Sequence, residues 1–276
     1  MPRRISQLCG TKTLIMGVIN ATPDSFSGDG IGIDVDAALG QAHHFLQNGV
    51  DLIDVGGASS RPASIYRDVK PISAQEEIDR IIPIIDAISS ELDVTISVDT
   101  HKSKVAREAI KTGADIVNDI WGFEKDPDMV HVVRKTDVEV ILMHNADIPS
   151  YDDVVEDCID HLKKVVDKAV GSGIKRERII IDPGIGFAKT ASQNLEILRR
   201  LSEFKIIGSP ILVGTSRKST IGTVLDLPVN QRLEGTAATV AISIAKGADI
   251  VRVHDVAEMA KVVRMSDAIV RGWHDK

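Results

Sequence analysis

The sequence contains little of what disulfide-rich, membrane or nucleic-acid-binding proteins need. Its only cysteines are Cys9 and Cys158, which excludes a disulfide scaffold and favours a reducing cytoplasm. Aromatic residues make up 3% of the chain and the formal net charge is −7, so the basic stripes and stacking platforms of a nucleic-acid-binding protein are missing. No apolar run approaches the roughly 20 residues of a membrane helix, and polar residues after the basic start argue against a signal peptide. A cytoplasmic enzyme that binds neither nucleic acid nor membrane is therefore expected.

The sequence does contain short apolar runs that alternate with longer stretches of helical period. The runs are rich in Val and Ile and apolar on both faces, which is typical of strands in a covered parallel sheet. Between two runs, Val155, Ile159, Leu162 and Val166 show the spacing of an amphipathic helix. The eight predicted strands are residues 14–19, 52–55, 94–98, 115–117, 138–143, 179–181, 211–213 and 250–253.

Three segments repeat a pattern of glycine, a small apolar residue, aspartate and two apolar residues. They occupy residues 49–54, 113–118 and 247–252. Each indicates a glycine that closes a helix, a turn and the start of a strand. The last residue of each segment is polar: Asp54, Asn118 or Arg252. Because parallel strands joined by helices point the same way, these side chains should converge at one end of the sheet.

The spacing of the strands predicts the fold class. Asn20 and His254 are 234 residues apart over seven repeats, about 33 residues per unit, close to the roughly 31 of a (β/α)8 barrel. An open doubly wound sheet is the alternative, but it usually has fewer strands and a glycine fingerprint after the first. We therefore predict an α/β protein with one domain, a (β/α)8 TIM barrel over residues 1–276.

Every predicted strand ends in side chains that can do chemistry. They are Asn20, Asp54, Asp99, Asn118, Asp119, His144, Asn145, Asp182, Ser216, Arg217, Lys218, Arg252, His254 and Asp255. Barrel enzymes build their sites at this rim, although single members could instead cap helices or pair with one another. A site with three carboxylates and three cations predicts a substrate with a donor-rich part and an anionic part. These six residues are Asp99, Asp119, Asp182, Lys218, Arg252 and His254.

Two strand ends have features of ligand-binding loops. Asp182 precedes a glycine loop, where a carboxylate suits the parallel N–H groups of an aminopyrimidine, although a plain tight turn is the alternative. Ser216 lies where a helix should begin, which indicates an anion site. Arg217 stands where a phosphate-binding loop needs glycine, and this excludes an ATPase of that kind.

The last strand carries two cationic donors on one side. Arg252 and His254 alternate along it and could together hold a phosphate, with salt bridges to Asp255 or Asp249 as the alternative. The histidines and cysteines have no zinc-binding spacing.

The strand-end motifs resemble those of dihydropteroate synthases, in the same order along nearly the whole chain. The matching segments are residues 20–27, 54–62, 97–100, 118–120, 142–144, 182–184, 216–219 and 252–256. Ala58 stands where that family usually has glutamate, Ser60 replaces a threonine, and the loop after His144 is shorter than in many relatives.

The resemblance implies a pterin-binding enzyme that joins p-aminobenzoate to a dihydropterin methyl diphosphate, releases pyrophosphate and forms dihydropteroate for folate synthesis. It also implies a homodimer, a requirement for Mg²⁺ and inhibition by sulfonamides. The implied pterin site is Asp99, Asn118, Met143, Asp182 and Lys218. Asn20, Ser60, Arg252 and His254 would bind the diphosphate, with Asn20 on the Mg²⁺. Arg61, Pro62, Phe187, Lys189 and Ser216 would bind p-aminobenzoate. Asp99, Lys218, Arg252 and His254 are the implied catalytic residues.

Three alternatives remain at this level. A methyltetrahydrofolate methyltransferase would need the pterin site but no aminobenzoate site, so Arg61 and Ser216 argue against it. A non-catalytic pterin-binding paralogue would explain Ala58, but not the retention of Asn20 and Asp99. The third alternative is a Schiff-base aldolase that uses Lys218.

Overall fold

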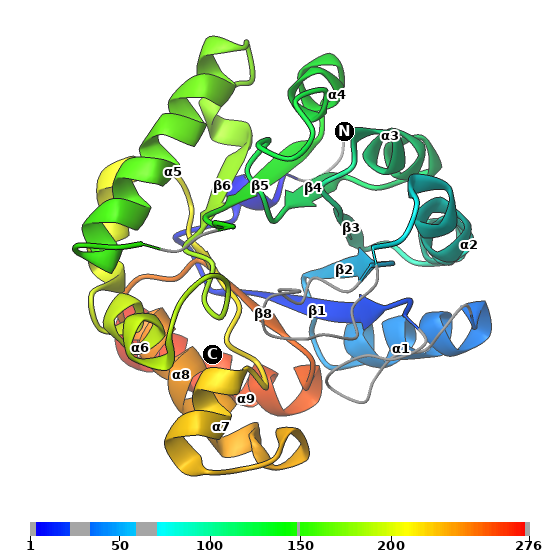
Figure 1. Ribbon diagram of the computed structural model, residues 1–276. Helices are drawn as coiled ribbons and strands as arrows, with labels where there is room; N and C mark the ends of the chain where they lie inside the picture. Colours follow the sequence, from blue (N-terminus) through cyan, green and yellow to red (C-terminus); the bar gives the residue numbers. More distant parts are fainter. Residues whose placement is uncertain (1–3, 23–33, 59–70, 148–149, 274–276) are drawn as a thin grey trace.

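The computed structural model describes residues 4–22, 34–58, 71–147 and 150–273. Ser60, Arg61 and Pro62, which the family resemblance assigns to the diphosphate and aminobenzoate sites, lie outside these ranges. Eight strands run parallel in the order β6-β5-β4-β3-β2-β1-β8-β7, and a parallel bridge between Ile181 and Ile211 joins the two outer strands. The sheet is therefore a nearly closed barrel, viewed along its axis in Figure 1. The predicted fold class is confirmed.

All eight predicted strands are present. Five of them continue one or two residues beyond the predicted end, into the polar residues of the rim. The strands are β1 (Leu14–Asn20), β2 (Leu52–Gly56), β3 (Thr95–Asp99), β4 (Ile116–Asp119), β5 (Glu139–Met143), β6 (Ile179–Asp182), β7 (Leu212–Val213) and β8 (Ile250–Val253).

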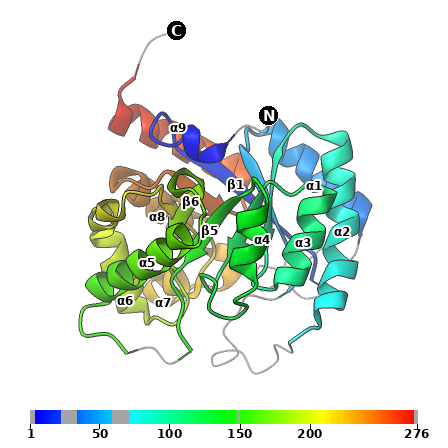
Figure 2. The ribbon, with the colours of Figure 1, turned by 90° about the horizontal axis from the view of Figure 1, so that it is seen from above.

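The helices surround the barrel and bury its outer face (Figures 1 and 2). They are α1 (Val35–Gln47), α2 (Ala74–Glu91), α3 (Ser103–Thr112), α4 (Met129–Lys135), α5 (Val154–Gly171), α6 (Ala191–Arg199), α7 (Ser219–Leu225), α8 (Leu233–Ala245) and α9 (Val256–Arg271). Four short 3-10 helices accompany them: η1 (Ile5–Gln7), η2 (Arg176–Arg178), η3 (Leu201–Ile207) and η4 (Val229–Gln231). No helix in the described part of the chain has the length and apolar character of a membrane span.

The inside of the barrel has an apolar floor. Strand residues that face inward alternate with residues that face the helices, and the inward set forms one buried cluster with Ile5 of η1. The Glu139 carboxylate accepts hydrogen bonds from the backbone N–H groups of Ile5 (2.8 Å) and Ser6 (2.9 Å), which fixes η1 across the bottom. Two residues beyond the floor, the same strands carry the candidate site. The floor-to-site pairs are Leu52 and Asp54, Ile116 and Asn118, Ile141 and Met143, Ile180 and Asp182, and Ile250 and Arg252.

The repeated glycine-aspartate pattern has a structural role in each of its three copies. The glycines that follow α1, α3 and α8 have φ between +84° and +128°, a backbone conformation that favours glycine. The aspartate of each copy accepts a hydrogen bond from a backbone N–H in a neighbouring strand or, in the third copy, from the residue that directly precedes that strand. The pairs are Asp51 with Ile15 (2.9 Å), Asp115 with Ile96 (3.0 Å) and Asp249 with Ile211 (2.9 Å). The pattern thus sets the register of the strands that it precedes.

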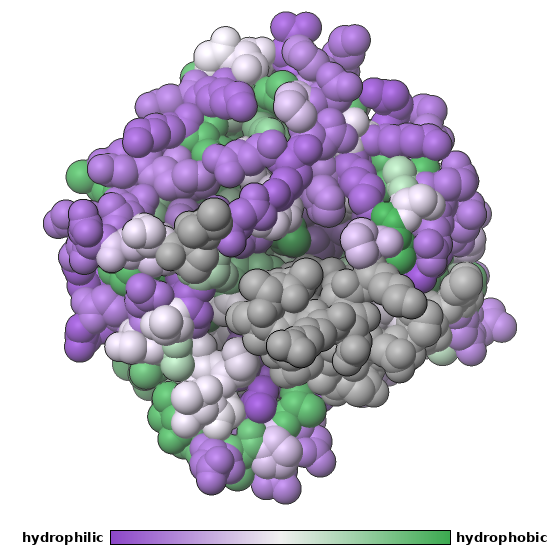
Figure 3. Space-filling model, viewed as in Figure 1, coloured by the Kyte–Doolittle hydropathy of each residue, from purple (hydrophilic) through white to green (hydrophobic). Residues whose placement is uncertain are grey.

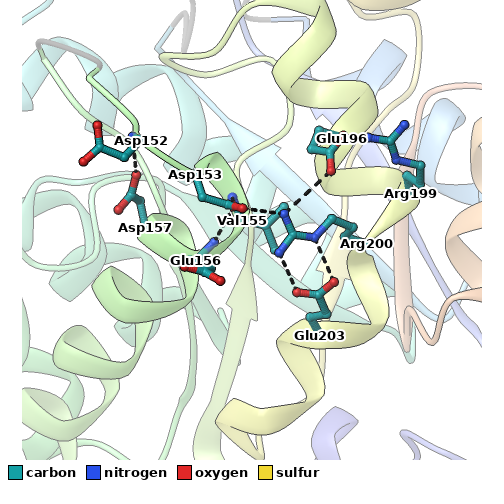
Figure 4. A network of polar contacts seen from close by, with 9 residues as sticks. All are labelled: Asp152, Asp153, Val155, Glu156, Asp157, Glu196, Arg199, Arg200 and Glu203. Carbon is teal, nitrogen blue, oxygen red and sulfur yellow. Dashed lines mark hydrogen bonds and ion pairs between the residues drawn. The ribbon is translucent and has the colours of Figure 1, made fainter.

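A surface network of ion pairs joins the start of α5 to the end of α6 (Figure 4). The Arg200 guanidinium contacts Asp153 at 2.7 Å and Glu203 at 2.8 Å, and it lies 3.7 Å from Glu196. Asp153 also caps α5 by accepting hydrogen bonds from the backbone N–H groups of Val155 and Glu156. Because exposed ion pairs contribute little to stability, we interpret this network as an aid to helix orientation.

Candidate active site

The three polar residues that end the repeated pattern meet at one carboxylate oxygen. Oδ2 of Asp54 accepts hydrogen bonds from Nε of Arg252 at 2.7 Å and from Nδ2 of Asn118 at 3.1 Å. The same guanidinium donates from Nη2 to Oδ2 of Asp99 at 3.1 Å. The predicted convergence of these strand ends is confirmed. Arg252 pairs with Asp54 and Asp99, so the alternative pairing with Asp255 or Asp249 is wrong.

The two carboxylates of this cluster are in an unusual electrostatic environment. Burial and the neighbouring negative charge of Asp54 raise the pKa of Asp99 to about 7, although Arg252 acts in the opposite direction. Asp54 is fully buried, and its Oδ1 has no hydrogen-bond partner among the described residues. The resemblance assigns no binding role to Asp54. Its register with Asn118 and Arg252 in the repeated pattern is the sequence signal that identifies it.

The loop after β6 lies against the loop after β7 through Lys218. The Lys218 ammonium donates to the backbone carbonyl of Ile185 and lies 4.7 Å from the centre of the Phe187 ring. Gly186 has φ +83°, and a Cβ there would lie 2.8 Å from Cδ of Lys218, so the lysine side chain passes directly over this glycine. Burial lowers the pKa of Lys218 to about 8. Lys218, Phe187 and the β6 loop therefore form one packed unit.

The carboxylate of Asp182 lies at the start of this unit. Its Oδ1 accepts a hydrogen bond from the backbone N–H of Gly184 at 2.7 Å, which fixes the first turn of the loop. Burial raises the pKa of Asp182, while the positive charge of Lys218 lowers it. Met143, on the adjacent strand β5, is buried beside it in register. Both are residues of the predicted pterin site.

Lys189 lies inside the β6 loop. Its ammonium contacts three acceptors: Nδ1 of His144 at 2.9 Å and the backbone carbonyls of Gly184 and Phe187, each at 3.1 Å. Burial and the positive charge of Lys189 lower the pKa of His144 to about 2, so this imidazole remains a neutral acceptor. An ammonium has three protons, and here all of them have protein acceptors. The contacts of Lys189 therefore stabilise the loop.

Ser216 and His254 lie next to each other. His254 donates its backbone N–H to the Ser216 hydroxyl at 3.2 Å, and its Nδ1 lies 2.9 Å from the same oxygen. Helix α7 begins at Ser219, so the prediction that a helix begins at Ser216 is wrong by three residues. Arg217 has φ +57°, which interrupts the helix, and its side chain forms an ion pair with Asp255.

Asp119 does not join the cluster. It follows Asn118 on β4 and therefore faces the opposite side of the strand. Both of its carboxylate oxygens accept backbone N–H groups of its own loop, from Trp121 and Phe123, each at 2.9 Å. The expectation that Asp119 is one of the three site carboxylates is wrong, because Asp119 binds the backbone of its own loop; Asp54 joins Asp99 in the cluster instead.

Asn20 is the residue expected to hold Mg²⁺. It ends β1, is half-buried and lies opposite Gly56 in the sheet register. Among the described residues there is no cluster of three His, Cys, Asp or Glu side chains that could hold a metal. Mg²⁺ usually keeps several waters and binds one or two protein oxygens together with substrate phosphates. The single amide oxygen of Asn20 fits an ion that arrives with a diphosphate.

Carboxylates, an amide and two cations at the carboxyl ends of eight parallel strands define a barrel enzyme with its site at this rim. The chain belongs to the pterin binding enzyme family, whose profile matches residues 16–254. It is 50% identical over 263 residues to the dihydropteroate synthase of Clostridium beijerinckii, covering 95% of this chain and 96% of that protein. It is 48% identical over 259 residues to the dihydropteroate synthase of Bacillus subtilis, covering 94% and 89%.

Solved structures of dihydropteroate synthases have the same fold. The Clostridium difficile enzyme in the presence of pteroic acid matches with a TM-score of 0.89 and 48% identity, covering 95% of this chain and 98% of that chain. The Yersinia pestis enzyme with a sulfonamide drug has a TM-score of 0.88 and 37% identity, covering 94% of both chains. The Xanthomonas albilineans enzyme with 4-aminobenzoic acid has a TM-score of 0.86 and 35% identity, covering 94% and 93%.

Proposed function

We infer that this chain catalyses the dihydropteroate synthase reaction in folate biosynthesis. It joins p-aminobenzoate to a dihydropterin methyl diphosphate and releases pyrophosphate, and sulfonamides target it. The observation that carries this conclusion is the 50% identity to a dihydropteroate synthase over nearly the full length of both proteins. The contacts that bring Asn118, Asp99 and Arg252 together at one end of the barrel, through Asp54, support it. We propose that residues 1–276 act as one catalytic domain.

The proposed pterin site is Asp99, Asn118, Met143, Asp182 and Lys218. A carboxylate has two oxygens that match the parallel N–H groups of an aminopyrimidine, and Asp182 offers this pair. Oδ1 of Asp182 already accepts a hydrogen bond from the Gly184 N–H, and this bond orients the carboxylate before the ligand arrives. Lys218 donates to the acceptor edge of the ring, and its contacts with Ile185 and Phe187 fix its position.

In the chemical step, the bond between the pterin methylene and the diphosphate oxygen breaks, and its electron pair leaves with pyrophosphate. The amine nitrogen of p-aminobenzoate then bonds to the methylene and loses a proton. The ionised carboxylate of Asp99 favours positive charge on the pterin methylene, and Arg252 and His254 stabilise the departing anion. Because the amine is neutral, the step needs no Ser-His-Asp type nucleophile activation.

Asn20 is the proposed ligand of Mg²⁺, and Ser60 the proposed second contact to the diphosphate. If bound there with the diphosphate, Mg²⁺ would supply positive charge beside the leaving group. The chain's own contribution is the amide oxygen of Asn20, which β1 fixes at the rim beside β2.

The proposed p-aminobenzoate site consists of Arg61, Pro62, Phe187, Lys189 and Ser216. The described members lie on the two loops that Lys218 joins. Ser216 offers a hydroxyl to the carboxylate of p-aminobenzoate, while His254 fixes the position of that hydroxyl. The buried ammonium of Lys189 contributes positive charge and holds the carbonyl of Phe187 in place.

A homodimer in the cytoplasm is also part of the proposal. The exposed apolar side chains of Ile242 on α8 and of Met265 and Ile269 on α9 lie on adjacent helices. In Figure 3, hydrophobic and neutral residues gather over the region of α6 to α8, whereas most of the other coloured residues on this face are hydrophilic. Analytical ultracentrifugation should give a dimer that Ile242→Glu dissociates; a monomeric wild-type protein would refute this assembly.

The reaction is tested with purified protein, dihydropterin methyl diphosphate, p-aminobenzoate and Mg²⁺. We expect pyrophosphate release that requires the amine, dihydropteroate as the product, loss of activity with a chelator and inhibition by a sulfonamide. Asp182→Asn should raise the KM for the pterin substrate. Methyl transfer from methyltetrahydrofolate to a corrinoid without pyrophosphate release would instead identify a methyltransferase. Trapping of a carbonyl substrate on Lys218 by borohydride would identify an aldolase.

A further inference from the structure

We propose that Asp54 is the positioning residue of the pterin site, because it sets where the Arg252 guanidinium and the Asn118 amide lie. This inference rests on the proposed function and goes beyond it, since neither the family resemblance nor the comparisons give Asp54 a role. It assigns a single task to the carboxylate: to accept both donors from opposite sides with one oxygen.

The geometry of the strands makes Asp54 a central acceptor. β2 lies two strands from β4, which carries Asn118, and two strands from β8, which carries Arg252. Both side chains cross the barrel interior to reach the same Oδ2, at 3.1 Å and 2.7 Å. In the nearly closed barrel only β2 and β6 lie midway between β4 and β8, so Asp54 on β2 is equally many strands away from both donors.

The contact with Asp54 decides which atoms Asn118 and Arg252 offer to a ligand. An ionised carboxylate only accepts hydrogen bonds, so the amide nitrogen of Asn118 faces Asp54 and the amide oxygen faces away. That oxygen is then an acceptor for a ring N–H or an exocyclic amine. Arg252 uses Nε on Asp54 and Nη2 on Asp99, so the plane of its guanidinium is fixed by two carboxylates. The site thereby presents an acceptor and an oriented cation, which match the donor-rich pterin and the anionic diphosphate.

The burial of Asp54 argues against a merely stabilising role. Its side chain is fully buried, and Oδ1 has no partner among the described residues. Ser97, its register neighbour on β3, is also fully buried and has no partner for its hydroxyl among the same residues. A buried carboxylate oxygen without a hydrogen bond is unfavourable for folding. A group that lowers stability in this way and contacts two site residues is best explained by the positions that it gives them.

The test compares Asp54→Asn with Asp119→Asn in the full-length protein. Asp54→Asn keeps the volume and one acceptor oxygen, but it removes the negative charge that pairs with the Arg252 guanidinium and adds an N–H donor beside the two donors already there. Asp119 is a matched control: it is also a buried carboxylate at a strand end, and among the described residues its hydrogen bonds come from backbone N–H groups of its own loop. Thermal unfolding checks the fold of both variants. Asp54→Glu is a second variant, which keeps the charge and displaces the oxygens.

In Asp54→Asn we expect kcat/KM for dihydropterin methyl diphosphate to fall about 100-fold, as for a small misplacement of reacting groups. The KM for the pterin substrate should rise in Asp54→Asn, whereas the KM for p-aminobenzoate should remain unchanged. Asp54→Glu should also have a raised KM for the pterin substrate, because its oxygens are displaced. The acidic limb of the profile of kcat/KM against pH should move to lower pH, because Asp99 then loses the negative charge that most raises its pKa, while Arg252, Glu77 and Asp119 remain. If Asp54 only stabilised the fold, the variant would contain less folded enzyme. Its apparent kcat would then fall in proportion, and neither KM nor the acidic limb of the pH profile would change.

Three outcomes would overturn the inference. These are unchanged pterin KM and acidic limb in Asp54→Asn, the same KM changes in Asp119→Asn, and full pterin affinity in Asp54→Glu. If wild-type protein forms no dihydropteroate, the proposed function fails instead. In that case calorimetric titration of the same variants with pteroic acid still tests Asp54: an unchanged affinity for this probe refutes its positioning role, and a loss confined to the Asp54 variants supports it.

Discussion

The activity of this chain should be confined to a narrow range of pH, because two site residues titrate close together. Asp99 has a pKa of about 7, raised by burial and by Asp54, and Lys218 has a pKa of about 8, lowered by burial. The proposed reaction uses the ionised carboxylate of Asp99 and the protonated side chain of Lys218. With these two values, roughly 60% of the enzyme is in this form near pH 7.5, but only about 10% at pH 6 or pH 9.

The profile of kcat/KM against pH should therefore be a bell that has fallen about sixfold from its maximum by pH 6 and by pH 9. It is measured by pyrophosphate release from pH 5.5 to 9.5 at constant ionic strength. Asp99→Asn should lose the acidic limb and Lys218→Met the alkaline limb, each with a much lower rate. Ionisation of the substrates is the same for all three proteins, so the variants separate it from ionisation of the enzyme. A flat wild-type profile between pH 6 and 9, or limbs that persist in both variants, would refute the reasoning.

Other predictions concern the loop after β6 and the strand register. Gly184→Ala should lower the melting temperature and the activity together, because a Cβ there would lie 2.0 Å from the carbonyl oxygen of His144 at φ +73°; unchanged melting would contradict this. Lys189→Met leaves three acceptors without a donor and should reduce the free energy of unfolding by about 1–3 kcal/mol in a denaturant titration. Asp249→Ala removes the acceptor of the Ile211 N–H and should cost about 1–3 kcal/mol in the same assay; wild-type stability would exclude its role in register.

The strands and the convergence of the site could be predicted from the sequence. Strands covered on both faces need continuous apolar residues, so all eight appear as apolar runs. The repeated pattern then fixes which residue of β2, β4 and β8 faces inward at the rim, and this placed Asn118 and Arg252 correctly. The same register argument applied to Asp54, whose partners depend on strands β4 and β8 in three dimensions.

Side-chain partners in the loops could not be predicted. Lys189 reaches His144 only because the loop turns back through Gly184 at φ +73° and Ala188 at φ +49°, and no sequence pattern specifies that path. Asp119 follows Asn118 directly, and only the alternation of the strand decides which of the two faces inward. The late start of α7 depends on the left-handed conformation of Arg217, a residue that seldom adopts it.

The barrel is joined least securely between β6 and β7. β7 has two residues, and only the bridge from Ile181 to Ile211 links it to β6. Asp182 ends β6 and Lys218 follows β7, so a pterin bound to both residues would connect the two strands. Pterin binding would therefore stabilise the junction between β6 and β7, and amide exchange in β7 should slow when pteroic acid saturates the protein.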